Sequence, residues 1–91
     1  MATHTKTHKD IETEIIEAKK LVKIGGIYSH YKNPAHHYKV ITLAMQEATD
    51  KLCVIYETQY GKKLLFVRDL DNWLTQPEVN GKKVDRFTLI K

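Results

Sequence analysis

The sequence predicts a mainly β domain, α+β by content, in which one N-terminal amphipathic helix covers a strongly bent antiparallel sheet or SH3-like open barrel of five or six strands. Apolar residues recur at helical spacing before residue 25, whereas β-branched and aromatic residues dominate short runs after it. The 91 residues, 42% of them hydrophobic, can form one core. We therefore predict a flexible N-terminus over residues 1–8, a helix over 9–24 and a β domain over 25–91.

The helix over residues 9–24 is predicted from an apolar stripe and from signals at both ends. Apolar side chains recur every three or four positions and so share one face. These are Ile11, Ile15, Ile16, Ala18, Leu21 and Val22, of which Ile16 and Leu21 widen the stripe. Thr7 and Asp10 have the spacing of a capping box, and the glycine pair at residues 25–26 offers a left-handed stop. A helix with one apolar face needs a sheet to pack against.

The strands are predicted from β-rich runs and the turn signals between them. The expected strands are residues 26–31, 38–45, 52–60, 64–68 and 87–90, with a small hairpin around 78–84. The turn signals are Asn33-Pro34, the polar stretch 47–51, Gly61-Lys62 and Asn80-Gly81. Residues 69–74 are predicted to form one helical turn, capped by Asp69, with Trp73 and Leu74 pointing inward.

Charge and composition restrict the partners. Fifteen Lys and Arg against eleven Asp and Glu give +4, which permits an anionic ligand but falls short of a dedicated nucleic-acid binder. The excess lies in residues 61–91, at two Lys-Lys turns that either keep hairpin ends soluble or frame an anion-attracting rim. No apolar run suits a membrane span or a secretory signal, and the single cysteine suits a reducing compartment, so we expect a cytoplasmic protein without membrane contact.

The sequence lacks the residue patterns typical of nucleophilic catalysis, metal binding and phosphate-binding loops. Cys53 lies in an apolar run, as expected of a packed, inert thiol, and Ser29 and His30 are neighbours that point to opposite faces of a strand. His4 and His8 are four residues apart, and three more histidines surround one predicted loop, without cysteines or carboxylates to complete a metal site. The glycine pair precedes a strand, unlike a phosphate-binding loop. We therefore predict no cofactor and no metal.

Aromatic and basic residues interleave along the predicted strands, a pattern that small β domains use for stacking and cation–π recognition. The candidate ligand-binding residues are Tyr28, His30, Tyr31, Lys32, Tyr56, Arg68 and Arg86. The favoured interpretation is a non-enzymatic recognition module for a short peptide or small anionic ligand, as a monomer or weak homodimer. The alternatives are a binder of RNA or single-stranded DNA and a small enzyme, or enzyme regulator, with His30 and Glu57 as acid and base.

The same residues resemble a known family. The matching segments are GIYSHYK (26–32), YKV (38–40), CVIYETQYG (53–61), FVRDL (66–70), EVNGK (78–82) and RFTLI (86–90). In this order they are similar to the bacterial domain-of-unknown-function family 1653, with Phe66 where a tryptophan is usual and Asp69 where a proline is common. The resemblance implies a compact, mostly β domain without an assigned function, to which the N-terminal helix is an addition. In a purely structural role, Arg68 would pair with Glu57, and Arg86 with Asp69 or Asp71.

Overall fold

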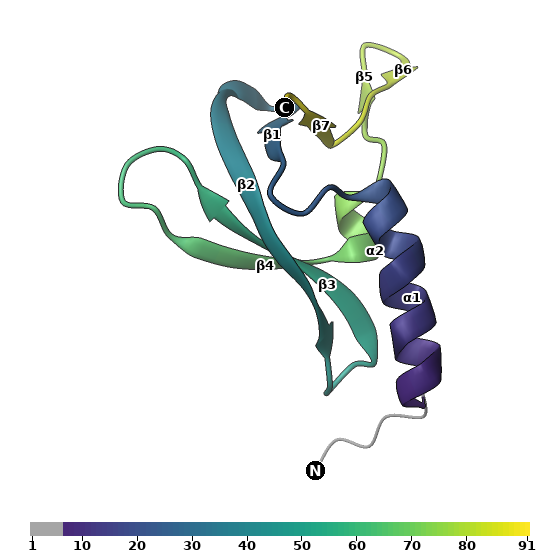
Figure 1. Ribbon diagram of the computed structural model, residues 1–91. Coiled ribbons are helices and arrows are strands. Elements are labelled where there is room, and N and C mark those ends of the chain that lie inside the picture. Colours follow the sequence, from purple (N-terminus) through teal and green to yellow (C-terminus); the bar gives the residue numbers. More distant parts are fainter. Residues whose placement is uncertain (1–6) are drawn as a thin grey trace.

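The computed structural model describes residues 7–91, which form a helix-covered sheet and a small separate hairpin. The elements are α1 (His8–Leu21), β1 (Ile27–His30), β2 (Asn33–Gln46), β3 (Lys51–Thr58), β4 (Leu65–Asp69), α2 (Leu70–Trp73), β5 (Glu78–Val79), β6 (Lys82–Lys83) and β7 (Phe87–Leu89). Five strands pair antiparallel in the order β4-β3-β2-β1-β7, and β5 pairs with β6 (Figure 1). Because β4 and β7 lie at opposite edges, the sheet is open, and the mainly β class is confirmed. Neither helix within residues 7–91 has the length and apolar character to cross a membrane.

Helix α1 begins at His8, one residue before the predicted start, and has the predicted cap. Residues 1–6 of the predicted flexible N-terminus lie outside the described residues. The Thr7 hydroxyl accepts the Asp10 amide at 3.1 Å, and the Asp10 carboxylate accepts the Thr7 amide at 3.2 Å, so the capping box is confirmed. The buried stripe is narrower than predicted, because Ile16 and Leu21 are 58% and 62% exposed. Within the helix Ala18 is buried, and Val22, the residue just after the helix, is fully buried too. Ile11 and Ile15 are only partly covered.

The predicted end of α1 is wrong by three residues. The helix ends at Leu21, and Val22 already has extended backbone angles. The Gly25 amide donates to the Val40 carbonyl at 2.8 Å, and the Val40 amide donates to the Gly26 carbonyl at 3.0 Å. Pairing with β2 therefore takes the Gly25 amide, which would donate to the Leu21 carbonyl if the helix continued to residue 24. Gly25, with φ of +83°, serves the turn into the sheet instead of a helix stop.

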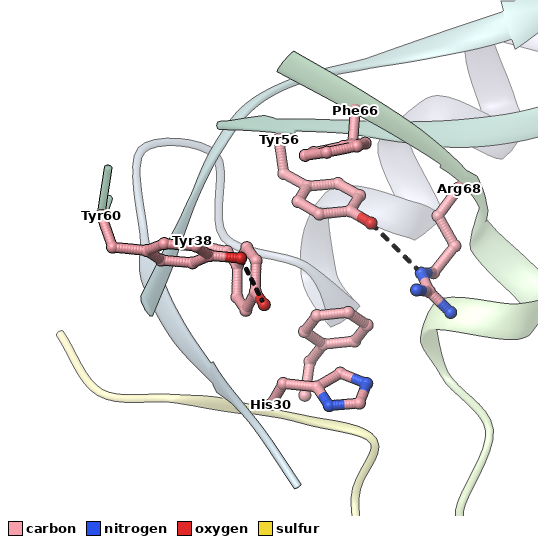
Figure 2. A pocket seen from close by; sticks show the side chains of 7 residues that line it. His30, Tyr38, Tyr56, Tyr60, Phe66 and Arg68 are labelled. Carbon is pink, nitrogen blue, oxygen red and sulfur yellow. Dashed lines mark hydrogen bonds between the residues drawn. The ribbon is translucent and has the colours of Figure 1, made fainter. Parts of the chain in front are cut away.

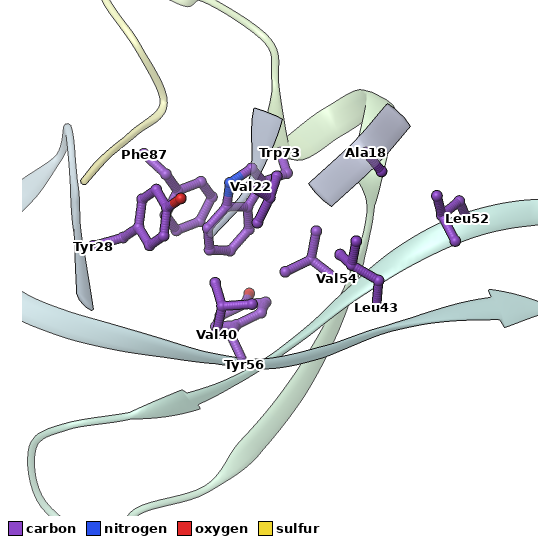
Figure 3. Packing of buried hydrophobic residues seen from close by; sticks show 10 residues of the cluster. All are labelled: Ala18, Val22, Tyr28, Val40, Leu43, Leu52, Val54, Tyr56, Trp73 and Phe87. Atoms are coloured by element: carbon purple, nitrogen blue, oxygen red, sulfur yellow. The ribbon is translucent and has the colours of Figure 1, made fainter. Parts of the chain in front are cut away.

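The core lies on one face of the sheet, which we call the inner face. Residues on β2 and β3 that alternate toward this face meet α1 and α2, as Figure 3 shows. The buried cluster comprises Ala18, Val22, Tyr28, Val40, Leu43, Leu52, Val54, Tyr56, Trp73 and Phe87. Trp73 and Phe87 stack with ring centres 3.7 Å apart and planes 3° apart. The last strand and the short helix are thereby held to the same core.

The β1–β2 connection is tighter than predicted. The chain reverses at Tyr31 and Lys32, and Asn33 already pairs with His30, so Asn33 and Pro34 begin β2 instead of forming a loop. A proline at the beginning of a strand is tolerated because few ladder hydrogen bonds need its missing N–H. The stretch predicted as a loop is therefore part of the 14-residue β2.

Helix α2 confirms the predicted helical turn but not its cap. Asp69 occupies the N-cap position without a side-chain cap hydrogen bond. Its carboxylate instead accepts the Cys53 thiol at 3.5 Å and lies 4.0 Å from the Lys51 amino group. Trp73 points inward and is 3% exposed, as predicted, whereas Leu74 is 41% exposed and does not.

Candidate functional site

An aromatic pocket opens on the inner face beside the core, with which it shares two side chains (Figure 2). It has a volume of about 290 Å³. Its lining residues, which define the aromatic pocket from here on, are His30, Tyr38, Tyr56, Tyr60, Phe66, Arg68 and Phe87. They come from all five strands of the sheet and from the loop after β3.

Strand register brings these side chains together. His30 pairs with Phe87 across β1 and β7, and Tyr56 pairs with Phe66 across β3 and β4. Directly opposed residues on neighbouring strands project to the same face, so the pairs form two aromatic walls. Tyr38 on β2 lies between them, with its ring centre 5.7 Å from that of Tyr56 and 5.9 Å from that of Phe87.

Arg68 is held in place at one end of the aromatic pocket. Its Nε donates to the Tyr56 hydroxyl at 3.4 Å, and its Nη1 donates to the side-chain oxygen of Asn72. The guanidinium carbon lies 5.2 Å from the centre of the Phe87 ring, at cation–π distance. The lining residues include no aspartate or glutamate, so within the pocket the positive charge of Arg68 is not compensated.

His30 presents a neutral donor to the same space. Its Nδ1 accepts the Lys32 amide at 3.2 Å, so the proton of the neutral ring is on Nε2. Burial and, after it, the positive charges of Arg68, Arg86 and Lys32 lower the pKa of His30 below its usual value. Near neutral pH the ring is therefore uncharged and carries an N–H donor at Nε2.

A tyrosine pair closes the opposite side. The hydroxyl groups of Tyr38 and Tyr60 lie 3.3 Å apart. Burial and this hydrogen bond raise the pKa of Tyr38 to about 12, so the hydroxyl stays protonated at physiological pH. The His36 ring stacks on the Tyr60 ring with centres 3.9 Å apart. This stacking positions Tyr60, which lies in the loop after β3.

Of the seven predicted binding residues, three line the aromatic pocket, three gather outside it, and Tyr28 lies in the core. His30, Tyr56 and Arg68 line the aromatic pocket. Tyr31, Lys32 and Arg86 gather outside it: the Arg86 and Lys32 side chains lie 5.5 and 6.0 Å from the Tyr31 ring centre, and the Tyr31 and His30 rings are 4.9 Å apart.

Tyr28 belongs to the core and does not line the pocket. It is 5% exposed, and its ring meets Trp73 edge-on with centres 5.3 Å apart. Its hydroxyl accepts the Lys23 amide at 2.8 Å just after α1. This hydrogen bond satisfies the polar end of a buried tyrosine, as a structural role requires.

Sequence reasoning left four lining residues out of the candidate set: Tyr38, Tyr60, Phe66 and Phe87. Phe66 could have been found from its position opposite Tyr56, but only if the register between β3 and β4 were known. Phe87 could have been found only from the pairing of β7 with β1, which places it opposite His30 although the two residues are far apart in the chain. Composition alone cannot separate these rings from core aromatics.

The acid–base pair of the enzyme alternative is not brought together. Glu57 pairs with Lys39 and Leu65 and projects from the face opposite to Tyr56, where it accepts Gln59 Nε2 at 3.0 Å. His30 contacts Tyr38 and Phe87 on the inner face. The same alternation keeps Arg68 from pairing with Glu57.

The structure also shows the surroundings of Arg86 and Cys53. Arg86 Nε donates to the Thr75 hydroxyl at 2.8 Å, in place of the expected carboxylate. Cys53 is 3% exposed, and burial together with its hydrogen bond to Asp69 raises the pKa of the thiol, as expected of an inert cysteine. Residues 7–91 contain no group of three or more His, Cys, Asp or Glu that could hold a metal ion; His4 lies outside the described residues.

The effect of Arg68 on His30 can be measured. Replacing Arg68 by glutamine removes a positive charge that lowers the pKa of His30, so that pKa should rise toward the ordinary value of 6.5 and stay below it, because burial remains. A titration of the His30 ring protons followed by NMR measures the change. Lys83→Gln, which removes the same charge from the β5–β6 hairpin, is the control and should leave the pKa unchanged. An unchanged or lowered pKa in Arg68→Gln would contradict the electrostatic coupling.

Comparison with known proteins places the β domain in a family. A model described as a protein of unknown function (DUF1653) matches residues 26–89, which leaves α1 outside the match. The crystal structure of a DUF1653 protein from Bordetella bronchiseptica superimposes with a TM-score of 0.63 at 28% identity, over 72% of this chain and 85% of that one. No curated protein matches the chain. Because the match covers most of the sequence and all five strands of the sheet, this chain belongs to the DUF1653 family.

Proposed function

We propose that this domain is a non-enzymatic recognition module that binds a short ligand through an oxyanion, such as a carboxylate, in the aromatic pocket. One observation carries the proposal: the polar groups of Arg68, Tyr56 and His30 that remain available in the pocket are donors. The Tyr56 oxygen accepts Arg68 Nε, so its own proton is free for another acceptor. His30 has its acceptor nitrogen occupied, and its Nε2–H is free. An oxyanion accepts all of these hydrogen bonds.

The rings around these donors favour a ligand with a flat or apolar part. Phe66 is 46% exposed and Tyr60 is 39% exposed, so their surfaces are accessible. Aromatic faces bind planar groups by stacking, and partial exclusion of water strengthens the hydrogen bonds to the anion. A peptide end or a small aromatic acid has both parts. Single-stranded nucleic acid also combines anion and ring, and it is distinguished below by its salt dependence.

Benzoate and its neutral isostere benzamide test the proposal. In an NMR titration, benzoate is expected to shift the backbone amides of His30, Tyr56 and Arg68, and benzamide is expected to bind several-fold more weakly, because hydrogen bonds to a charged acceptor are stronger. Benzoate should bind more tightly as the pH falls below 6.5, through the lowered pKa of His30, because protonation of the ring adds a positive charge.

Two results would count against this proposal. Equal affinity for benzoate and benzamide would show that the domain does not recognise the negative charge. Chemical shift changes confined to other surfaces would show that benzoate does not bind in the aromatic pocket. An oligouridylate that binds at the pocket with a log-linear loss of affinity on raising salt, where benzoate does not bind, would favour the nucleic-acid alternative instead.

A further inference from the structure

Strand β4 forms an open edge of the sheet with an apolar surface. It lies at one end of the strand order, and within residues 7–91 its outer side pairs with no strand (Figure 1). Four consecutive apolar residues here are exposed: Leu64 (56%), Leu65 (62%), Phe66 (46%) and Val67 (64%). Natural edge strands usually carry charges or prolines that prevent pairing. Here the charged residues stand only at the two ends, so the middle of the edge is unprotected.

The register shows which backbone groups of β4 point outward. The Thr58 amide donates to the Leu64 carbonyl at 3.0 Å, so Leu64 faces β3 with its hydrogen-bonding groups. In an antiparallel ladder, hydrogen-bonded and non-hydrogen-bonded pairs alternate. Phe66 and Arg68 therefore also bond to β3, whereas Leu65, Val67 and Asp69 direct their amide and carbonyl groups to the open edge.

We propose that this edge pairs with β4 of a second copy of the chain, antiparallel, with Phe66 opposite Phe66 of the other copy. In this register Leu65 of each copy lies opposite Val67 of the other copy. Both have outward-directed backbone groups, so they form regular hydrogen-bonded pairs. Phe66 falls at a non-hydrogen-bonded position, where opposed side chains come closest and an aromatic pair packs well.

The charges at the ends of the edge favour a second copy as the partner. With Phe66 at the centre, Lys63 stands opposite Asp69 of the other copy, and the complementary pair forms at the far end. Opposite charges directly across a strand pair stabilise it, and like charges destabilise it. Moving the centre to Val67 would place Asp69 opposite Leu65 and Arg68 opposite Phe66. The centred register instead pairs Leu65 with Val67, Phe66 with Phe66 and Lys63 with Asp69, and leaves only Leu64 opposite a charged residue, Arg68.

The proposed dimer has a consequence for the aromatic pocket. The two-fold axis of such a strand pair runs perpendicular to the sheet, so both inner faces would look in the same direction. Phe66 lines the pocket and stands at the axis, so the two pockets would lie on one side of a continuous sheet. The dimer would offer two neighbouring sites on one surface, whatever ligand they bind.

Sedimentation over a range of concentrations tests the association. The wild-type mass is expected to rise from 10.6 kDa toward twice that value as concentration increases. Val67→Lys places charges in the middle of the apolar edge and should leave a monomer; since Val67 is exposed, folding should be preserved, which circular dichroism checks. Thr42→Lys adds the same charge on an exposed β2 position away from the edge and should still dimerise. A monomer at all concentrations, or a Val67→Lys dimer, would overturn the proposal.

Cysteine cross-linking tests the register. Phe66→Cys puts two thiols opposite each other across the axis, at a separation that a disulfide can bridge. Leu64→Cys is the control on the same strand: its thiol would face Arg68 of the other copy, with the two thiols four residues apart along the pair and beyond disulfide reach. Phe66→Cys should form covalent dimers under mild oxidation much faster than Leu64→Cys. Equal rates would exclude the centred register.

Discussion

Replacing Trp73 by alanine is expected to lower the free energy of unfolding by about 3–5 kcal/mol. The Trp73 side chain is 3% exposed and stacks on Phe87 at 3.7 Å. It also meets Tyr28 and Tyr56 edge-on, at 5.3 and 5.1 Å between ring centres. The substitution therefore opens a cavity where α2, β1, β3 and β7 meet. Small domains have about 5–15 kcal/mol of stability in total, so the loss would be a large share.

Urea unfolding followed by circular dichroism measures this loss, because the variant lacks the only tryptophan. Leu74→Ala is the matched control: it truncates the adjacent residue, which is 41% exposed, and should cost less than about 1 kcal/mol. A similar cost for both variants would mean that Trp73 does not connect the short helix to the core. Trp73→Phe should recover part of the stability, since a ring remains between Tyr28 and Phe87.

Arg68→Gln is expected to weaken benzoate binding about tenfold or more, which corresponds to the roughly 1.5–3 kcal/mol of a hydrogen bond to a charged group. Arg68 supplies the positive charge of the aromatic pocket, and its hydrogen bond to Tyr56 directs the tyrosine proton away from the arginine. Glutamine keeps a polar side chain but loses the charge and the two-pronged donor. An NMR titration at constant pH and salt measures the dissociation constant.

Arg86→Gln is the control for Arg68→Gln, because it removes the same charge from a residue that does not line the pocket and is bonded to Thr75. It is expected to change benzoate affinity less than about twofold, a surface-charge effect that salt screens. Tyr56→Phe removes one donor and keeps the ring, so it should give an intermediate loss. Equal weakening by both arginine variants would mean that net charge attracts the anion without a defined site.

The local elements were predictable because short-range chemistry determines them. Thr7 and Asp10 form their capping box within one turn, and the β3 strand follows from an unbroken apolar and aromatic run. Predictions failed where distant segments compete for the same groups. The helix end moved because β2 pairs with Gly25 and Gly26, and the Asp69 cap was lost because Cys53 and Lys51 take its carboxylate.

The sequence by itself determined the mainly β class, the N-terminal helix, the family and the kinds of residue from which a binding site could be made. Which of these residues meet was decided only by the tertiary structure. Tyr28 and His30 have the same sequence signal, yet Tyr28 meets Trp73 in the core and His30 faces the aromatic pocket. The physical reason is that strand register and the return of β7 beside β1 join residues that are far apart in the chain, and no local pattern encodes those pairings.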